Sequence, residues 1–512
     1  MEIYRSLFSF FPDNIDYGLR LAAAQKQART VDEVLSTLAA LRQLPIPNGN
    51  DPRIDLQEAD VFDVKGAYQQ QQSAAAAAAT RSNSVGAKQL LAHALTQQAR
   101  SLEKQGSPNE ALRKAQEAVQ ISTAAGERTE VAKALTVMGI VHFDQGNFSE
   151  AANVYHQALV IQREIGDKRG AATTLNDIAN ALGEQGDLAA AIKMLEGSLK
   201  MFREVGDRHS AAAVFGSIAA RTIQQGNLAR ARKMLQDGLS ASREIGDQER
   251  AGTALYNLGE VMRFQSDLKQ ASKVYERALA LSKAIGDQSG VAYATFSIGD
   301  VLTAQGDLAG ARRKYTEALN LRKQIGETGT AAETQFALAA LSYEEGRAQE
   351  AEEMARQARE EFRKDGSTDD EISADTLLAR SLLAQGRTGD AQKEIAGARD
   401  LLAKSQDFCV QLAASIVTAR VQAASGGFSE AIRELGETIA RAEKSGYAGL
   451  ALEGKLALGE VELAADNVSQ GKSTLSAVRL EAQRKGYNLV ASKANRKTAV
   501  PISSPETGRR SK

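Results

Sequence analysis

The sequence predicts an all-α protein, an α-solenoid in which antiparallel helix pairs stack one after another. Three observations lead to this fold class. Small residues recur every 40 positions, as Gly106, Gly146 and Gly186 do (146 − 106 = 40). No proline lies between Pro108 and Pro501, so nothing there breaks a helix. Hydrophobic residues make up 43% of the chain but aromatic residues only 5%, because much of the apolar content is alanine, the best intrinsic helix former.

Each repeat carries small residues in four columns. The first is the glycine column, in which Ser266 and Asp466 replace glycine. The second lies seven residues earlier and holds only alanine and glycine: Ala99, Gly139, Ala179, Ala219, Gly259, Gly299, Ala339, Ala379, Ala419 and Gly459. Two further small columns begin at Ala111 and Ala118. Small residues at fixed places on successive helices let those helices cross closely, whereas bulk there would push the pair apart.

Two glycine turns divide each repeat into helix, turn, helix, turn. At residues 185–187 the sequence Gln-Gly-Asp predicts a left-handed glycine after one helix and an aspartate that caps the next. Residues 165–167, Ile-Gly-Asp, repeat the same chemistry at the other turn. Asn147 followed by Glu150 has the spacing of a capping box.

These columns resemble the tetratricopeptide repeat (TPR) family, whose unit has a small residue in its first helix and an alanine, an aromatic residue and another alanine in its second. The family's unit of roughly 34 residues is lengthened here to 40. In this respect the chain is similar to the extended-repeat branch that includes the kinesin light chain and the spindle-orientation proteins. The family's proline after the second helix is missing. The resemblance implies a right-handed superhelix.

Four segments follow from the repeat register. Residues 94–495 form the regular array. Residues 15–93 are degenerate TPR-like helix pairs, interrupted by a proline-rich break at 45–52. Residues 1–14 match the last part of a unit, and residues 496–512 are expected to form a disordered basic tail.

The first segment predicts a contact surface. Terminal repeats need a polar outer face, but the following side chains form an apolar edge: Tyr4, Leu7, Phe8, Phe10 and Phe11. Self-association or a partner is expected there. This layout, a partial unit followed by a long array, resembles the C-terminal TPR arrays of bacterial serine/threonine kinases and winged-helix regulators.

Composition argues against several other classes of protein. A net charge of −1 gives no whole-chain field for nucleic acid, and no apolar run reaches the ~18 residues that a membrane span needs. The single Cys409 excludes an intrachain disulfide, which fits a cytoplasmic setting. No metal and no cofactor are expected, because the four histidines form no cluster with ligand spacing.

An enzyme is not expected either. The sequence has no Ser/His/Asp set and no phosphate loop. Cys409 lies on an apolar stretch and is interpreted as an inert thiol. Acidic runs such as residues 369–371 are interpreted as solvated faces or helix starts rather than catalytic carboxylates.

Binding is therefore sought on the concave face, which the first helix of each unit forms. We expect the partner-binding residues to lie beside the second column, on the face that it shares with them. The predicted residues are Asn176, Asn180, Tyr256, Glu260, Arg263, Tyr293, Phe296 and Asp300. The aromatic rings would anchor apolar side chains, and the carboxylates of Glu260 and Asp300 would favour Lys or Arg. Packing between repeats is the alternative role of the aromatic stripe.

Two functions follow. The first is a non-enzymatic scaffold that binds a peptide or a helix of a partner protein, with basic and apolar character, in its concave groove. The alternative is a regulatory or sensory module of a bacterial kinase or transcriptional regulator system. The repeats themselves do not identify the partner.

Overall fold

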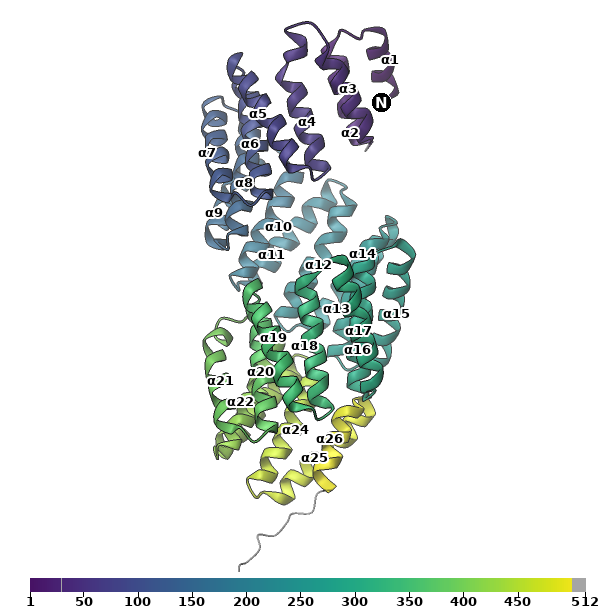
Figure 1. The fold of residues 1–512 in the computed structure, drawn as a ribbon, viewed down its shortest axis with the longest axis vertical. Coiled ribbons are helices and arrows are strands. Elements are labelled where there is room, and N and C mark those ends of the chain that lie inside the picture. Colours follow the sequence, from purple (N-terminus) through teal and green to yellow (C-terminus); the bar gives the residue numbers. More distant parts are fainter. Residues whose placement is uncertain (29, 500–512) are drawn as a thin grey trace, which may run out of the picture. The chain divides into compact units, whose positions relative to one another are not determined.

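The computed structural model describes residues 1–28 and 30–499, and these form helices and turns without any strand. The predicted all-α fold of paired helices is confirmed (Figure 1). The chain divides into two compact units, Met1–Asp207 and Arg208–Lys512, which we call unit 1 and unit 2. Their boundary lies inside the regular array, at a Gly-Asp turn that has the same sequence pattern as its neighbours.

Unit 1 begins with one helix and continues in pairs. Its helices are α1 Glu2–Phe10, α2 Ile15–Gln27, α3 Val31–Arg42, α4 Pro52–Val64, α5 Tyr68–Ser84, α6 Lys88–Lys104, α7 Pro108–Ala124, α8 Arg128–Asp144, α9 Phe148–Glu164, α10 Lys168–Glu184 and α11 Leu188–Glu204, with a short 3-10 turn at Asn48–Asn50. The proline-rich break separates α3 from α4, because a proline there can start a helix but cannot continue one.

Unit 2 continues the same pattern. Its helices are α12 Arg208–Gln224, α13 Leu228–Glu244, α14 Gln248–Phe264, α15 Leu268–Ile285, α16 Gln288–Gln305, α17 Leu308–Ile325, α18 Thr328–Glu344, α19 Ala348–Asp365, α20 Thr368–Ala384, α21 Thr388–Leu402, α22 Phe408–Ala424, α23 Phe428–Lys444, α24 Ala448–Ala464, α25 Val468–Lys485 and α26 Asn488–Ala499. Within the described residues, helices α2 to α25 form twelve pairs.

The turns have the chemistry that the sequence predicts, with one exception. Gly146 has φ +75°, and Ser266 and Asp466 take the same left-handed conformation in spite of their Cβ atoms. Asp167 accepts a hydrogen bond from the backbone N–H three residues later. The predicted capping box at Asn147 is wrong, because its side chain makes no cap hydrogen bond and lies 3.5 Å from the amide of Gln145 instead.

Both ends of the array differ from the interior repeats. Of the predicted apolar edge, Phe10 is 83% exposed and Phe11 53% exposed, whereas Tyr4, Leu7 and Phe8 are half-buried and Phe8 packs against the core of the following helices. The edge is therefore only partly exposed, and self-association there stays a prediction. Helix α26 runs to Ala499, so the first residues of the predicted tail are helical. The rest of that tail, 500–512, lies outside the described residues. In the described part, no helix combines the length and the hydrophobicity that crossing a membrane needs.

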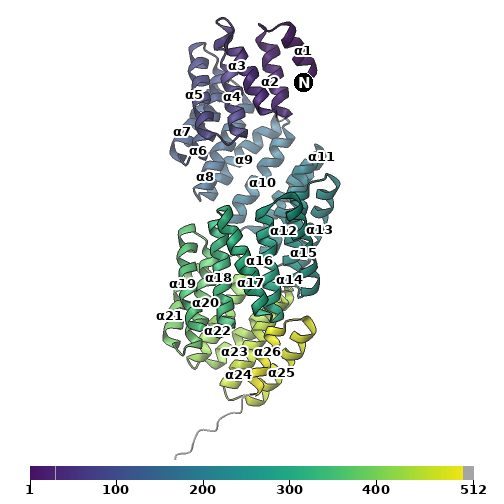
Figure 2. The ribbon, with the colours of Figure 1, turned by 45° about the vertical axis from the view of Figure 1, so that its right-hand side comes forward.

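Unit 2 closes on itself, because its last helices contact helices near its beginning. Helix α26 packs against α16, and α24 contacts α14 (Figures 1 and 2). Tyr447 Oη donates to the carbonyl oxygen of Ile223 at 3.0 Å, and Tyr487 Oη donates to that of Arg263 at 3.0 Å. Each bond joins residues 224 positions apart, so the two tyrosines make equivalent long-range hydrogen bonds in successive repeats. They occupy the column in which most earlier repeats have the aspartate cap.

Candidate functional site

The closed stack of unit 2 surrounds a cavity with a volume of about 540 Å³. The first helix of each pair from α14 to α24, together with α26, contributes to its wall. Its aromatic and aliphatic lining includes Phe264, Phe296, Phe336, Tyr447, Leu450, Leu489 and Val490. An apolar cavity with a few polar groups is the usual form of a site for a small ligand or a peptide side chain.

Carboxylates dominate the charges of this cavity, which we call the acidic cavity. Its charged lining residues are Asp300, Glu333, Glu344, Asp370 and Glu453, with Arg263 as the cation. Burial raises the pKa of Asp370 to about 6, and the charge of nearby Glu333 adds to the rise. Among the described residues Asp370 has no hydrogen-bond or ion-pair partner. The acidic cavity therefore has negative charge that the protein leaves unmatched.

Arg263 does not supply the missing positive charge. Its Nη2 atom lies 2.7 Å from Glu260 Oε2 and 3.8 Å from Asp300 Oδ2, so it is shared between two carboxylates. Tyr275 donates a hydrogen bond to Glu260, and Tyr315 donates one to Asp300 at 2.7 Å. Burial raises the pKa of Asp300, although the charge of Arg263 opposes the rise. The cluster is negative overall.

A second cavity of about 840 Å³ follows the C-terminal halves of the same inner helices. Its charged lining residues are Arg380, Arg420, Lys493, Arg496 and Lys497, with Glu344 and Glu460 as the acids. We call it the basic cavity. Arg420 Nη2 lies 3.1 Å from Glu460 Oε2, but its Nε and Nη2 atoms are buried and make no hydrogen bond with the described residues.

The two cavities meet at Glu344, which lines both. Arg380 donates to Glu344 at 2.9 Å, and Lys493 Nζ lies 2.7 Å from the other oxygen of that carboxylate. Lys493 also lies 3.5 Å from Glu453. Burial would raise the pKa of Glu453, but the charges of Lys493 and Arg380 outweigh it and lower that pKa. The junction pairs two acids with two cations and is neutral.

Three of the predicted partner-binding residues, Arg263, Phe296 and Asp300, line the acidic cavity. The Phe296 ring also packs against Tyr315, with ring centroids 5.3 Å apart, and lies 4.9 Å from the guanidinium of Arg322. Phe296 therefore packs against α17, the second helix of its own pair, and also lines the cavity. Partner binding by these residues stays a prediction.

The other predicted residues have different surroundings. The Tyr256 ring packs on Tyr293, with centroids 5.4 Å apart, and Glu260 is held by intramolecular bonds. Burial raises the pKa of Tyr256. Asn176 and Asn180 lie on α10 in unit 1, whereas the other six residues lie in unit 2. The eight predicted residues are therefore divided between the two units, with six in unit 2 and the two asparagines in unit 1.

Sequence reasoning missed the groups that distinguish the two cavities. Asp370 was interpreted as a helix start, which it also is. The inner positions of Arg420 and Lys493 carry no signal in one sequence. Tyr447 and Tyr487 did carry one, since they replace the capping residue of their column.

The acidic cavity contains no activated nucleophile. Cys409 lines it, but burial raises the pKa of the thiol to about 12, and the charge of Asp407 adds to the rise. A reactive cysteine needs a lowered pKa. In the described part of the chain, no group of three or more His, Cys, Asp or Glu side chains is placed to hold a metal ion.

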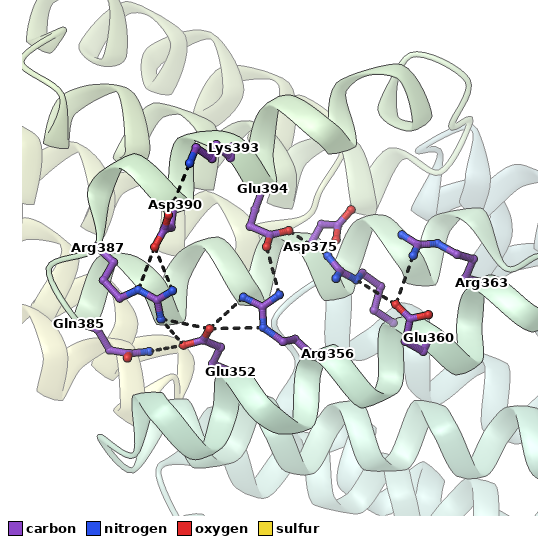
Figure 3. Close-up of polar contacts among 11 residues, drawn as sticks. Glu352, Arg356, Glu360, Arg363, Asp375, Gln385, Arg387, Asp390, Lys393 and Glu394 are labelled. Atoms are coloured by element: carbon purple, nitrogen blue, oxygen red, sulfur yellow. Dashed lines mark hydrogen bonds and ion pairs between the residues drawn. The ribbon is translucent and has the colours of Figure 1, made fainter.

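A second charged cluster, on α19, α20 and α21, links these helices through ion pairs and hydrogen bonds (Figure 3). Glu352 lies 2.9 Å from Arg356 and 3.0 Å from Arg387. Arg356 also reaches Glu394 on the next outer helix at 3.4 Å. Because these charges pair with one another, the cluster joins neighbouring repeats and leaves no charge for a ligand.

Unit 1 has a more polar cavity of about 600 Å³ on its inner helices. Several of its charges are paired, as in the contacts of Arg53 with Asp16 at 2.8 Å and of His93 with Glu130 at 3.1 Å, although Arg20 forms no ion pair with the described residues. Since the wall of this cavity is more polar than that of the acidic cavity, unit 2 holds the better candidate site.

Family comparisons agree with the repeats. The MalT-like TPR region family matches residues 239–493. The tetratricopeptide repeat family matches residues 90–164, 130–204 and 170–244, and these windows are displaced by the same 40 residues (130 − 90 = 40). The chain is a tetratricopeptide repeat protein. A comparison with curated protein sequences gives no match.

Solved structures share the fold of this TPR protein. RapI in its apo form is 14% identical with a TM-score of 0.56, and the match covers 70% of this chain and 99% of RapI. The apo quorum sensor NprR from B. thuringiensis is 16% identical with a TM-score of 0.50, covering 68% of this chain and 97% of NprR. Aspartyl phosphate phosphatase F from Bacillus subtilis is 12% identical with a TM-score of 0.50, covering 70% and 96%.

Proposed function

We propose that this chain is a non-enzymatic binding protein that holds a peptide segment of a partner protein inside unit 2. The observation that carries this proposal is the acidic cavity, which is lined by aromatic rings from successive inner helices. Flat rings such as Phe296 and Phe336 bind apolar side chains, and the carboxylates favour a partner that also carries Lys or Arg. A cytoplasmic location is part of the proposal.

A cavity-filling substitution tests this function. Ala340 lines the acidic cavity, so Ala340→Phe should fill part of it and reduce the capture of partner proteins from the source cell at least tenfold. Captured proteins are identified by mass spectrometry. Ala396→Phe on the exposed side of α21 is the matched control and should capture like the natural protein. Equal capture by both variants, with equal thermal unfolding, would place the partner outside the cavity.

A regulatory module is the second candidate. It rests on analogy, since the quorum sensor NprR has the same fold. In that case the bound segment would alter the activity of a kinase or a DNA-binding protein. A captured protein whose activity changes when it binds the natural chain, and not when it meets Ala340→Phe, would favour this role over a passive scaffold.

A further inference from the structure

The unmatched charges of unit 2 are separated along its inner helices. Asp370 lies at the start of α20 in the acidic cavity, and Arg380, whose charge is matched by Glu344, lies ten residues later on the same helix in the basic cavity. At 1.5 Å per residue, the two positions are ~15 Å apart. Arg420 occupies on the neighbouring inner helix α22 the repeat position that Arg380 occupies on α20 (420 − 380 = 40), so it lies at the same level along the inner helices in the basic cavity.

The two ends keep opposite charge after internal pairing. Glu460 is shared by Arg420 at 3.1 Å and Lys497 at 3.8 Å, so one acid faces two cations. Arg496 forms no ion pair within the described residues, and neither does Asp370 at the other end. The acidic cavity is therefore negative and the basic cavity positive, with a neutral junction between them.

We propose that unit 2 binds a short segment of a partner polypeptide in one charge orientation. A cationic group of the segment lies against Asp370, beside Glu333, whose carboxylate already lies 3.7 Å from Arg322. A carboxylate of the segment lies against Arg420 and Arg496. This inference rests on the proposed function above. An extended chain rises ~3.3 Å per residue, so about five residues span the ~15 Å between the charged ends. Apolar side chains between the ends contact the rings of the acidic cavity.

The positions of these charges also suit the dipoles of the inner helices, since acids lie near N-terminal ends and bases near C-terminal ends. The helix dipoles do not explain, however, why these charged groups are buried. Burial raises the pKa of Asp370 to about 6, and the buried Nε of Arg420 makes no hydrogen bond with the described residues. Both groups therefore lie in surroundings less favourable than water, and a ligand group of opposite charge relieves this at each end.

Synthetic peptide pools test the orientation. Each peptide has five residues, with the three central positions randomised among Leu, Phe, Val and Ala. The first pool begins with Lys and ends in a free carboxylate. In three matched pools the cationic end is replaced by acetylated norleucine, the carboxylate by an amide, or both. A fifth pool ends in a Glu amide, which separates a side-chain carboxylate from a chain terminus. Retention on the immobilised full chain is measured.

We expect the doubly charged pool to be retained at least tenfold more than the doubly neutral pool. Asp370→Asn should reduce retention only of pools with the cationic end, and Arg420→Gln only of pools with a carboxylate. Unchanged retention of the neutral pool shows that each variant is folded. Asp237→Asn and Arg433→Gln, on exposed outer faces, are the matched controls and should bind like the natural chain.

A pH series gives a second readout at the acidic end. The carboxyls that face Asp370 are Glu333, Asp369 and Asp407, so protonation of this group near pH 6 should remove the preference for a cationic end. The pools that end in an amide and carry no carboxylate isolate this effect from the basic cavity. Asp370→Asn should make retention of those pools nearly independent of pH.

The outcomes separate this inference from the proposed function. Equal retention of all the pools would overturn the charge orientation and leave peptide binding in place. Retention of no pool would overturn both. Loss of carboxylate-dependent binding in Asp370→Asn, or of cation-dependent binding in Arg420→Gln, would reverse the assignment of the two ends and overturn the inference as stated.

Discussion

Single residues in the small columns are matched to the side chains they face. A Cβ on Gly139 would overlap the ring of Tyr155, which lies in the second helix of the same pair. In the next repeat the equivalent positions are Ala179 and Leu195. Alanine is larger than glycine, and the leucine opposite it is smaller than tyrosine. The columns therefore record packing between two helices rather than a preference for glycine.

This matching makes a compensated substitution testable. Gly139→Ala should lower the free energy of unfolding by ~1–3 kcal/mol through overpacking, although alanine by itself favours a helix by ~0.5–1 kcal/mol. Adding Tyr155→Leu should recover part of the loss. Gly197→Ala is the control, because a Cβ there meets only ordinary contact at 3.5 Å and should be neutral or stabilising. Urea unfolding followed by helical circular dichroism measures all of them, and a stabilised Gly139→Ala would contradict the packing argument.

A second residue-scale prediction concerns Asp370. Burial raises its pKa in the folded protein to about 6, above the usual value of 3.8. A raised carboxyl pKa means that the folded state binds the proton more tightly, so this contribution to stability is present below pH 3.8 and is lost as pH rises through 6.

At pH 8 the charged form is therefore unfavourable, and Asp370→Asn should stabilise unit 2 by about 1–2 kcal/mol after allowance for partial exposure. Near pH 4 the substitution should have little effect. Thermal unfolding at both pH values checks this, with exposed Asp237→Asn as the control. Destabilisation at pH 8 would show that Asp370 is paired in solution.

Helices α19, α20 and α21 show how charged side chains join neighbouring elements in addition to apolar packing. Glu352 is 9% exposed and accepts hydrogen bonds from Arg356, Gln385 and Arg387. Burial would raise the pKa of Glu352, but these hydrogen bonds and the charge of Arg387 outweigh it and lower that pKa. The stabilisation is therefore present above pH 4.5 and is lost as pH falls further.

The matching test is Glu352→Gln, which keeps the volume and removes the charge. It should destabilise this part of unit 2 by ~1 kcal/mol, since its arginine partners are partly exposed and screened by solvent. Glu353→Gln, one residue later and exposed, should change stability by less than half of that. Chemical denaturation in low and high salt measures the difference. If the two variants were equal, the network would add nothing to stability.

The closure of unit 2 depends on many stacked repeats and not on any one residue or helix. Tyr447 and Tyr487 join repeats 224 residues apart, so their bonds form only after the intervening helices have stacked. Closing such a long loop is slow and entropically unfavourable until the contacts form. The walls of both cavities depend on it, because α24 and α26 line them.

The double variant Tyr447→Phe with Tyr487→Phe removes two hydroxyl groups and keeps both rings. Each lost hydrogen bond should lower stability by ~0.5–1.5 kcal/mol. Hydrogen exchange should speed up in α14, α24 and α26 and stay unchanged in unit 1. Tyr293→Phe, a nearby tyrosine, is the control. Unchanged exchange in α26 would show that ring packing alone closes the stack.

The sequence by itself determined the helices, their pairing and the turns. These depend on contacts between neighbours in the chain, such as the capping of a helix by Asp167 or the contact of Gly139 with Tyr155, and a 40-residue period repeats such contacts many times. It also placed Phe296 and Asp300 on the inner face, because residues on one side of a helix follow from helical spacing.

Only the tertiary structure decided which inner side chains share a cavity. The division at 207/208 and the closure of unit 2 depend on small rotations that add up over many repeats, and no single repeat encodes their sum. Asn176 was therefore grouped with residues of a different unit, while Asp370 and Arg420, far apart in sequence, were not grouped at all. Asp370 and Arg420 lie on the neighbouring inner helices α20 and α22, and the closure of the stack completes the walls of the two cavities that they line.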